Sequence, residues 1–173
     1  MASKKHYVIV SLTLGAIASV SALLIAGTNL LTKDIIAQNE KDNIAKGIKF
    51  IFGEKAEIKE EAEIKNEKYS YVDYVYEIGG EEDLGYVYRT TGKNMYGKIT
   101  LIIGFDLENK FVSTKTIVNE QTFTKEVETY VTNVDEGNRD INDVNCGATY
   151  GATLIRDMVN EASQANLDKV WKE

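Results

Sequence analysis

Charged and apolar residues are segregated along the chain, and the longest apolar stretch lies near the N-terminus. No Asp, Glu, Lys or Arg occurs between His6 and Thr32, a run of 27 residues. About 20 apolar residues in a helix, at a rise of about 1.5 Å each, cross the hydrocarbon core of a bilayer. The pattern therefore predicts a transmembrane helix, with residues 1–32 forming a cytoplasmic stub and a membrane anchor.

The flanking charges predict the orientation of this helix. Lys4 and Lys5 precede the apolar stretch, and positive charge favours the cytoplasmic side. We expect a single pass through the plasma membrane, with the N-terminus cytoplasmic and the C-terminal domain extracytoplasmic. A cleaved signal peptide is the alternative, because residues 18–22 are small. The apolar run continues beyond them to Ile25, which favours a retained anchor.

Beyond residue 32 the pattern predicts a helix followed by a sheet. Apolar residues at helical spacing predict an amphipathic helix over residues 33–52, and the charge run of residues 55–68 predicts a solvated connection. In residues 69–78, alternation places Val72, Tyr74, Tyr76 and Ile78 on one side of a strand. Three more strands are predicted, and their short turns, including one over residues 91–97, favour an antiparallel meander: residues 84–90, 98–105 and 110–118.

Two helices are predicted after the strands, over residues 124–131 and 151–166. The expected fold class is α+β: an N-terminal transmembrane helix followed by a twisted antiparallel sheet packed with helices. The expected organisation is an anchor, then an amphipathic helix with a charged connection over residues 33–68, then an α+β domain over residues 69–173.

The composition of the chain argues against several kinds of partner and site. Two of the 20 basic residues precede Lys33, which leaves 18 against 27 acidic residues and a net charge of −9 for the rest of the chain. This balance argues against nucleic acid as a partner, because phosphate binding needs clustered Lys and Arg. With one Cys and one His, neither a metal site nor a set of catalytic residues is predicted, so any chemistry is expected to come from a cofactor.

Residues 143–153 read DVNCGATYGAT and run into the last predicted helix. The N-terminus of a helix exposes unpaired N–H groups and a partial positive charge, which suit a phosphate group. Thr149 and Thr153 offer hydroxyl groups there. From these residues alone, an ordinary helix with a threonine N-cap is the alternative.

The spacing from Asp143 to Gly147-Ala148-Thr149 resembles the covalent flavinylation motif of the FMN-binding domain family. This family includes the G subunit of Rnf-type and the C subunit of Nqr-type membrane redox complexes. Other segments are similar to the family's anchor-proximal helix, its central strands and the helix after its flavin site: residues 29–40, 85–88, 96–106 and 153–160. The resemblance implies that Thr149 carries FMN through a phosphoester, installed from FAD by a flavin transferase that reads Asp143. It adds further candidate cofactor-binding residues: Cys146, Gly147, Ala148, Tyr150 and Glu120.

The chain departs from the family pattern at several positions. Cys146 stands where family members usually carry Ser or Thr, and the family's Glu-Thr-Pro-Gly loop corresponds to residues 119–123, which contain neither Pro nor Gly. Contacts to the flavin ring are therefore expected to differ at this loop. Thr153 follows a second Gly-Ala pair but has no Asp six residues upstream, so Thr149 is preferred. One tyrosine could stack on a flavin, with sheet packing expected for most of the set: residues 69, 71, 74, 76, 86, 88 and 96.

The resemblance implies a membrane-anchored extracytoplasmic flavoprotein that carries electrons. It would be a subunit of an Rnf-type ion-translocating ferredoxin:NAD oxidoreductase complex rather than a self-sufficient enzyme. Expected partners are the membrane, the other subunits and the flavin transferase during maturation, but no nucleic acid. Two alternatives stay open, a stand-alone flavin carrier in extracellular electron transfer and a non-redox anchored binding or assembly module. A secreted hydrolase is disfavoured because the chain lacks a His or Cys/His partner set.

Overall fold

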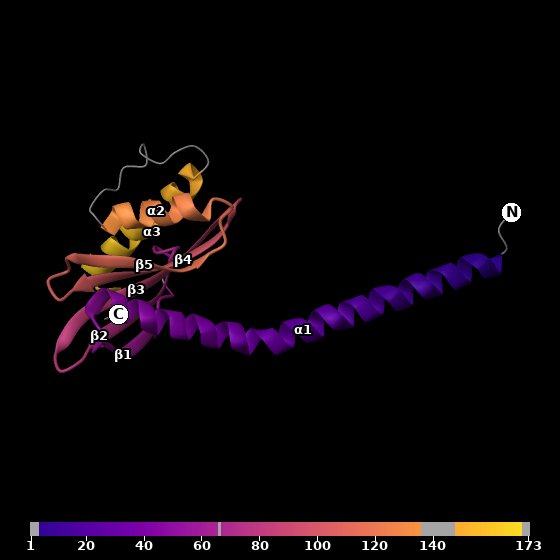
Figure 1. The fold of residues 1–173 in the computed structure, drawn as a ribbon, viewed down its shortest axis with the longest axis horizontal. Helices are drawn as coiled ribbons and strands as arrows, with labels where there is room; N and C mark the ends of the chain where they lie inside the picture. The colour runs from indigo at the N-terminus through magenta and orange to yellow at the C-terminus, as the bar shows by residue number, and fades with distance from the viewer. Residues whose placement is uncertain (1–3, 66, 136–147, 171–173) are drawn as a thin grey trace. The chain divides into compact units, whose positions relative to one another are not determined.

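The computed structural model describes residues 4–65, 67–135 and 148–170. Two units are distinguished by their internal contacts, Met1–Lys41 and Asp42–Glu173. Helix α1 (Lys4–Phe52) makes up the described part of the first unit and continues into the second (Figure 1). Its segment His6–Phe52 contains a stretch long and apolar enough to cross a membrane, and it is the one such helix in the described residues. The apolar helix predicted near the N-terminus is therefore confirmed.

Three threonine hydroxyls inside the apolar segment are satisfied by the helix itself. The hydroxyls of Thr13, Thr28 and Thr32 each donate a hydrogen bond to the carbonyl four residues earlier, over 2.8–3.0 Å. Such bonds remove the cost of placing a hydroxyl in hydrocarbon.

The second unit is built on a five-stranded antiparallel meander in the order β1-β2-β3-β4-β5. Two helices follow the sheet in the chain, which confirms the predicted α+β class. The strands are β1 (Glu57–Glu63), β2 (Val72–Gly79), β3 (Asp83–Asn94), β4 (Gly97–Asp106) and β5 (Phe111–Asn119), and the helices are α2 (Thr124–Asp135) and α3 (Thr149–Asp168).

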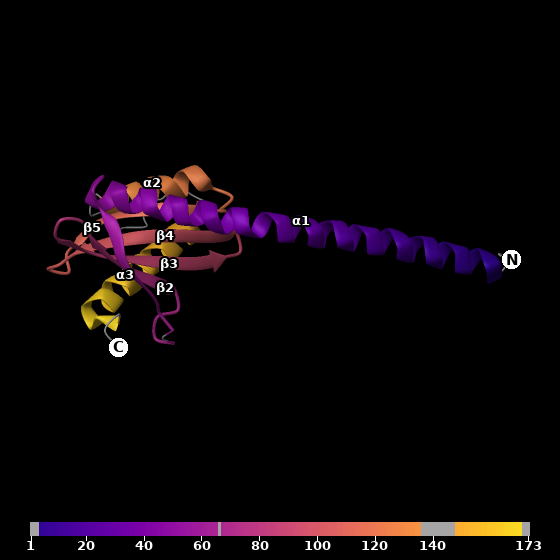
Figure 2. The same ribbon diagram turned by 90° about the horizontal axis from the view of Figure 1, so that it is seen from below.

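Both faces of the sheet are covered (Figures 1 and 2). Helices α2 and α3 pack on one face, in a core that includes Leu101 and Phe105. The last turns of α1 pack on the other face, where Ile48 joins Val87 and Ile102. Burial on two sides explains why β4 is apolar along most of its length instead of alternating.

The end of α1 runs in the same direction as β4. A Cβ built on Gly47 would lie 2.4 Å from the Ile102 side chain, and one built on Gly104 would lie 2.5 Å from that of Ile51. Residue numbers therefore rise together along the helix and the strand. The chain enters the second unit at the end of the sheet where β4 begins.

The charge run over residues 55–68 was predicted to be a solvated connection, and this was wrong, because it contains β1. Glu61 pairs with Tyr76 and Ala62 with Val75 in an antiparallel ladder with β2. The strand lies at the edge of the sheet and most of its side chains are exposed. Charged residues protect such edges from pairing with other chains, although Glu and Lys are depleted in strands generally.

Two details of the predicted hairpins were also wrong. The ladder between β2 and β3 shifts register between Val72 and Tyr74, so Val72 joins the core beneath the two later helices, on the opposite face from Tyr76. The predicted turn over residues 91–97 is instead an extension of β3 and β4, which leaves Met95 and Tyr96 as the connection.

Two carboxylates on α3 fasten this helix to the segment before β2. Glu161 Oε1 accepts hydrogen bonds from the backbone N–H of Tyr71 at 2.5 Å and of Val72 at 3.2 Å. At the C-terminal end of α3, Asp168 Oδ2 accepts one from Lys68 Nζ at 2.5 Å and another from the Tyr69 hydroxyl. These contacts fix the helix across the sheet.

The Asp168 contacts predict a dependence of stability on pH. The bond from Lys68, followed by that from Tyr69, lowers the pKa of Asp168 from 3.8 to about 2. A lowered pKa in the folded state stabilises the fold above the ordinary pKa, and this stabilisation is lost as the pH falls through the folded value. In urea unfolding of the detergent-solubilised chain, D168N is expected to lower stability at pH 7. The difference from the natural chain should disappear near pH 2.

The matched control for this experiment is D157N. Asp157 lies on the same helix and pairs with the neighbouring Arg156 at 3.0 Å, a surface contact that contributes little to stability. Its replacement should change the unfolding midpoint only slightly at either pH. A D168N effect of the same size at pH 7 and pH 2 would contradict the assignment.

Candidate functional site

The described candidate residues of the flavinylation motif lie at the N-terminal end of α3. This helix begins at Thr149, two residues before its predicted start. Ala148 is buried, whereas the side chains of Thr149 and Tyr150 are exposed. Asp143, Cys146 and Gly147 lie outside the described residues.

Thr149 does not cap the helix. The N-cap residue is Ala148, with φ −88° and ψ −5°, and no side chain of the described residues caps this helix end. The first backbone bond of the helix joins Ala152 N to Ala148 O at 2.8 Å, so the N–H groups of Thr149, Tyr150 and Gly151 precede it. Within the described residues the Thr149 hydroxyl makes no hydrogen bond. The threonine cap, the alternative open from sequence, is therefore contradicted.

The loop over residues 119–123 is fixed by amide side chains rather than by Pro or Gly. Gln121 is 5% exposed, and its Nε2 donates to Asn94 Oδ1 at 3.1 Å and to Gly97 O at 2.6 Å. The backbone N–H of Gln121 donates to Asn119 Oδ1, and its carbonyl accepts from the Thr124 hydroxyl. Sequence reasoning missed Gln121, since its partners lie on the β3–β4 hairpin, far from it in the chain.

Two glycines allow this loop to approach the hairpin and α3. Gly97 has φ +137°, and a Cβ there would lie 2.2 Å from Glu120 O, so only glycine fits. A Cβ on Gly151 would lie 2.7 Å from the Val127 side chain and 3.4 Å from Gln121 Oε1. Glu120, a sequence candidate, has its backbone held here while its side chain is exposed.

Three aromatic side chains gather beside Thr149. The ring centroids of Tyr96 and Tyr150 are 5.7 Å apart, and those of Tyr96 and Phe123 are 6.3 Å apart. Tyr150 is 61% exposed and Phe123 is 38% exposed. Sequence reasoning identified Tyr96 and Tyr150 but had no signal that would bring Phe123 to them.

Other tyrosines pack within the sheet, as predicted for most of them. Tyr76 and Tyr88 are buried on opposite faces. Burial raises the pKa of Tyr76 to about 12 and the pKa of Tyr88 as well. Both phenols therefore stay protonated at neutral pH, and neither is available at the candidate site.

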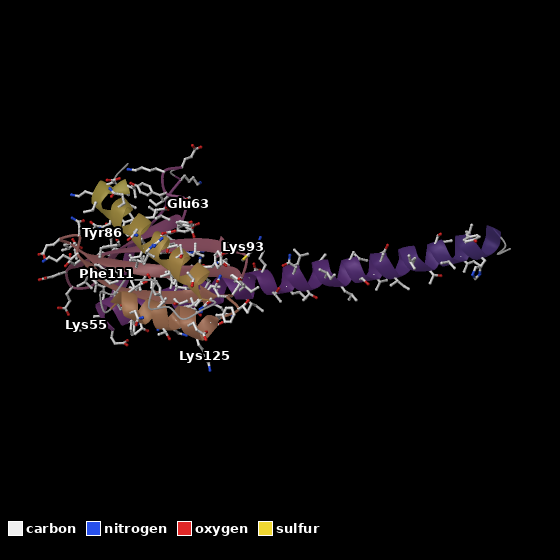
Figure 3. The ribbon with its side chains drawn as sticks, turned by 90° about the horizontal axis from the view of Figure 1, so that it is seen from above. Lys55, Glu63, Tyr86, Lys93, Phe111 and Lys125 are labelled. Carbon is white, nitrogen blue, oxygen red and sulfur yellow. The ribbon has the colours of Figure 1, made fainter. Side chains whose placement is uncertain are left out.

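Basic side chains occur at the end of the sheet that carries the site. Figure 3 shows Lys93 and Lys125 toward one end and Tyr86 and Phe111 toward the other. Lys93 adjoins Asn94, and Lys125 follows the loop that contains Phe123. The exposed acidic residue Glu120 lies at the same end, so the side chains there carry both signs of charge. Among the described residues, no group of three or more His, Cys, Asp or Glu could hold a metal ion.

The anchor helix and the folded unit together indicate a single-pass membrane protein. The comparison with protein families agrees with this class: residues 1–49 match the family model described as the RnfG N-terminal region. This similarity supports an Rnf-type subunit, a membrane complex with other subunits and a flavin-related role. The sheet, α2 and α3 lie outside the matched residues. No curated protein matches the chain.

Proposed function

We propose that the protein is an extracytoplasmic electron carrier anchored in the plasma membrane, with FMN joined to Thr149 through a phosphoester. It acts as a subunit of an Rnf-type ion-translocating ferredoxin:NAD oxidoreductase complex. The observation that carries the proposal is the exposed Thr149 hydroxyl, which neither caps α3 nor bonds to another described residue. We place flavin binding in residues 69–173.

The described residues fit a flavin attached by its phosphate. The exposed hydroxyl of Thr149 is accessible for attachment, and the N–H groups of the first turn, which no described side chain caps, can donate hydrogen bonds to the phosphate. The buried Asn94 Nδ2 has no hydrogen-bond partner among the described residues, which leaves a donor unsatisfied close to the site. Asn94 Oδ1, by contrast, accepts from Tyr96 N and Gln121 Nε2, so the orientation of the amide is fixed.

Transfer of the FMN group from FAD to Thr149 involves no change of oxidation state. Thr149 Oγ forms a bond to the flavin-side phosphorus, the pyrophosphate P–O bond to the adenylate breaks, and AMP leaves. The hydroxyl proton passes to a base of the flavin transferase, since no described residue bonds to Thr149. Bound FMN supplies one-electron chemistry, and this chain supplies its position and electrostatic surroundings.

The proposed topology and partners follow from the anchor. Lys4 and Lys5 favour a cytoplasmic N-terminus, so the second unit lies outside the cytoplasm, where a lost cofactor is hard to replace. The match of residues 1–49 to the RnfG N-terminal region favours a subunit of a complex over a stand-alone carrier.

Production of the full chain with and without a flavin transferase tests the proposal. With the transferase, a fluorescent band should survive denaturing electrophoresis. Without it, the protein should be colourless but have the same far-ultraviolet circular dichroism, because Thr149 is exposed and belongs to neither core. A chain that never acquires covalent flavin would favour an anchored binding or assembly module.

A further inference from the structure

The rings of Phe123 and Tyr150 both lie against the ring of Tyr96, and we name these three side chains the aromatic shelf. Tyr96 comes from the β3–β4 connection, Phe123 from the loop before α2, and Tyr150 from the first turn of α3. The Tyr96 ring lies at 48° to that of Tyr150 and at 64° to that of Phe123. Three segments distant in sequence thus place aromatic rings together beside Thr149.

The aromatic shelf is exposed, although large apolar side chains are normally withdrawn from water when a core is available. The fold has two cores, and Tyr88 and Phe105, which are of the same residue types as the shelf, are buried in one of them. Tyr150 remains largely accessible, Phe123 and Tyr96 are partly accessible, and the neighbouring Met95 is 78% exposed. A cluster of exposed apolar groups at one point marks a binding surface.

The backbone beneath the shelf is fixed before any ligand arrives. Asn94 Oδ1 accepts a hydrogen bond from Tyr96 N at 2.8 Å, and the same oxygen accepts from Gln121 Nε2. Gln121 is two residues from Phe123, and Gly151, which adjoins Tyr150, is packed against Val127. Because this surface is already ordered, binding of a planar ligand loses little conformational entropy of side chains and loops.

We infer that the aromatic shelf binds the isoalloxazine ring of the flavin whose phosphate is joined to Thr149. This inference rests on the proposed function and identifies the residues that position the ring. Tyr150 directly follows Thr149, so a ring at the far end of the ribityl chain can fold back over the shelf. Planar aromatic systems prefer offset-stacked or edge-to-face contact, which tyrosine and phenylalanine provide.

Flavin fluorescence tests this assignment independently of electron-transfer activity. A tyrosine in contact with a flavin quenches its fluorescence, because the phenol transiently gives an electron to the excited ring and then recovers it. The full chain, flavinylated by the transferase and held in detergent, should therefore fluoresce several-fold less when folded than after complete unfolding. The double variant Y96L/Y150L should show a several-fold gain in the folded state and lose the visible circular dichroism of an ordered flavin.

A matched tyrosine at a distance provides the control. Tyr71 contacts Glu161, which lies twelve residues beyond Thr149 on α3, or about 18 Å along the helix axis. The variant Y71L should keep the quenched fluorescence and the visible dichroism of the natural chain. The mass of each intact protein establishes that all three carry equal amounts of covalent flavin.

Two outcomes would overturn the assignment while leaving the proposed function intact. One is equal fluorescence of the folded and unfolded natural chain at full flavin loading, which would make the shelf a contact surface for another subunit. The other is a Y96L/Y150L chain that is loaded but still quenched. Absence of covalent flavin from the natural chain would reject the proposed function and this inference together.

Discussion

Replacing Thr149 by alanine is expected to abolish covalent flavin completely while leaving the fold unchanged. The variant removes the hydroxyl group that would form the phosphoester. It removes no hydrogen bond to a described residue and little buried surface, because the side chain is exposed. Alanine is also favourable in a helix. The chain co-produced with the transferase should show no fluorescent band on a denaturing gel, with an unchanged far-ultraviolet spectrum and unfolding midpoint.

Two neighbouring substitutions make this result specific. T153A removes a half-buried hydroxyl one turn further into α3 and should retain full flavin loading. T149S keeps a hydroxyl at the attachment position and should retain loading, although the rate of attachment is expected to fall. Covalent flavin on the T149A chain, or its absence from the T153A chain, would show that the flavin is attached at another residue.

The second large effect concerns the end of α1. A chain that begins at Asp42 is expected to be soluble and folded, whereas one that begins at Gly53 is expected to aggregate. The segment between them contributes Ile44, Ile48 and Ile51 to the core. Burying each such side chain is worth about 1.5–3 kcal/mol, so their joint loss approaches the whole stability of a typical domain. It would also expose an apolar sheet face.

Size-exclusion chromatography and urea unfolding of the two truncated chains test this expectation. Point variants in the chain beginning at Asp42 separate loss of packing from loss of length. I48D places a charge in the core and should cause aggregation, whereas F50D lies on the same helix at a side chain that is 61% exposed and should be tolerated. A monomeric chain from Gly53 with full stability would show that α1 is dispensable for the fold.

Elements with a strong apolar or periodic pattern could be predicted from sequence, whereas elements that form only through pairing with distant residues could not. The strongly apolar β4 and the amphipathic α3 were both evident. Strand β1 was not, because its Glu and Lys side chains are typical of a solvated loop and only pairing with β2 makes it a strand. Likewise the helix over residues 33–52 was predicted, but not that Ile48 would fill the core while Ile36 stays exposed.

At the candidate site, too, local features could be predicted from sequence and contacts between distant segments could not. The resemblance of the motif identified Thr149 from local spacing, since a motif is contiguous in the chain. The support for the site was not predictable, because Gln121 reaches Gly97 across 24 residues and the aromatic shelf joins three separate segments. The start of α3 at Thr149 rather than residue 151 also matters, since it turns an assumed capping group into an accessible one.

The parallel course of α1 and β4 has a consequence for electron delivery. The chain enters the second unit at the end where β4 begins, and this end also carries Tyr96 and Thr149. Residues 33–41 link this entry point to the uncharged segment, and nine residues span at most about 30 Å when fully extended. Under the proposed function, a flavin joined to Thr149 would therefore be connected to the membrane segment by a short stretch of chain. Its redox partners would be groups at the bilayer surface or within the complex, reached by small excursions, and not carriers met by free diffusion.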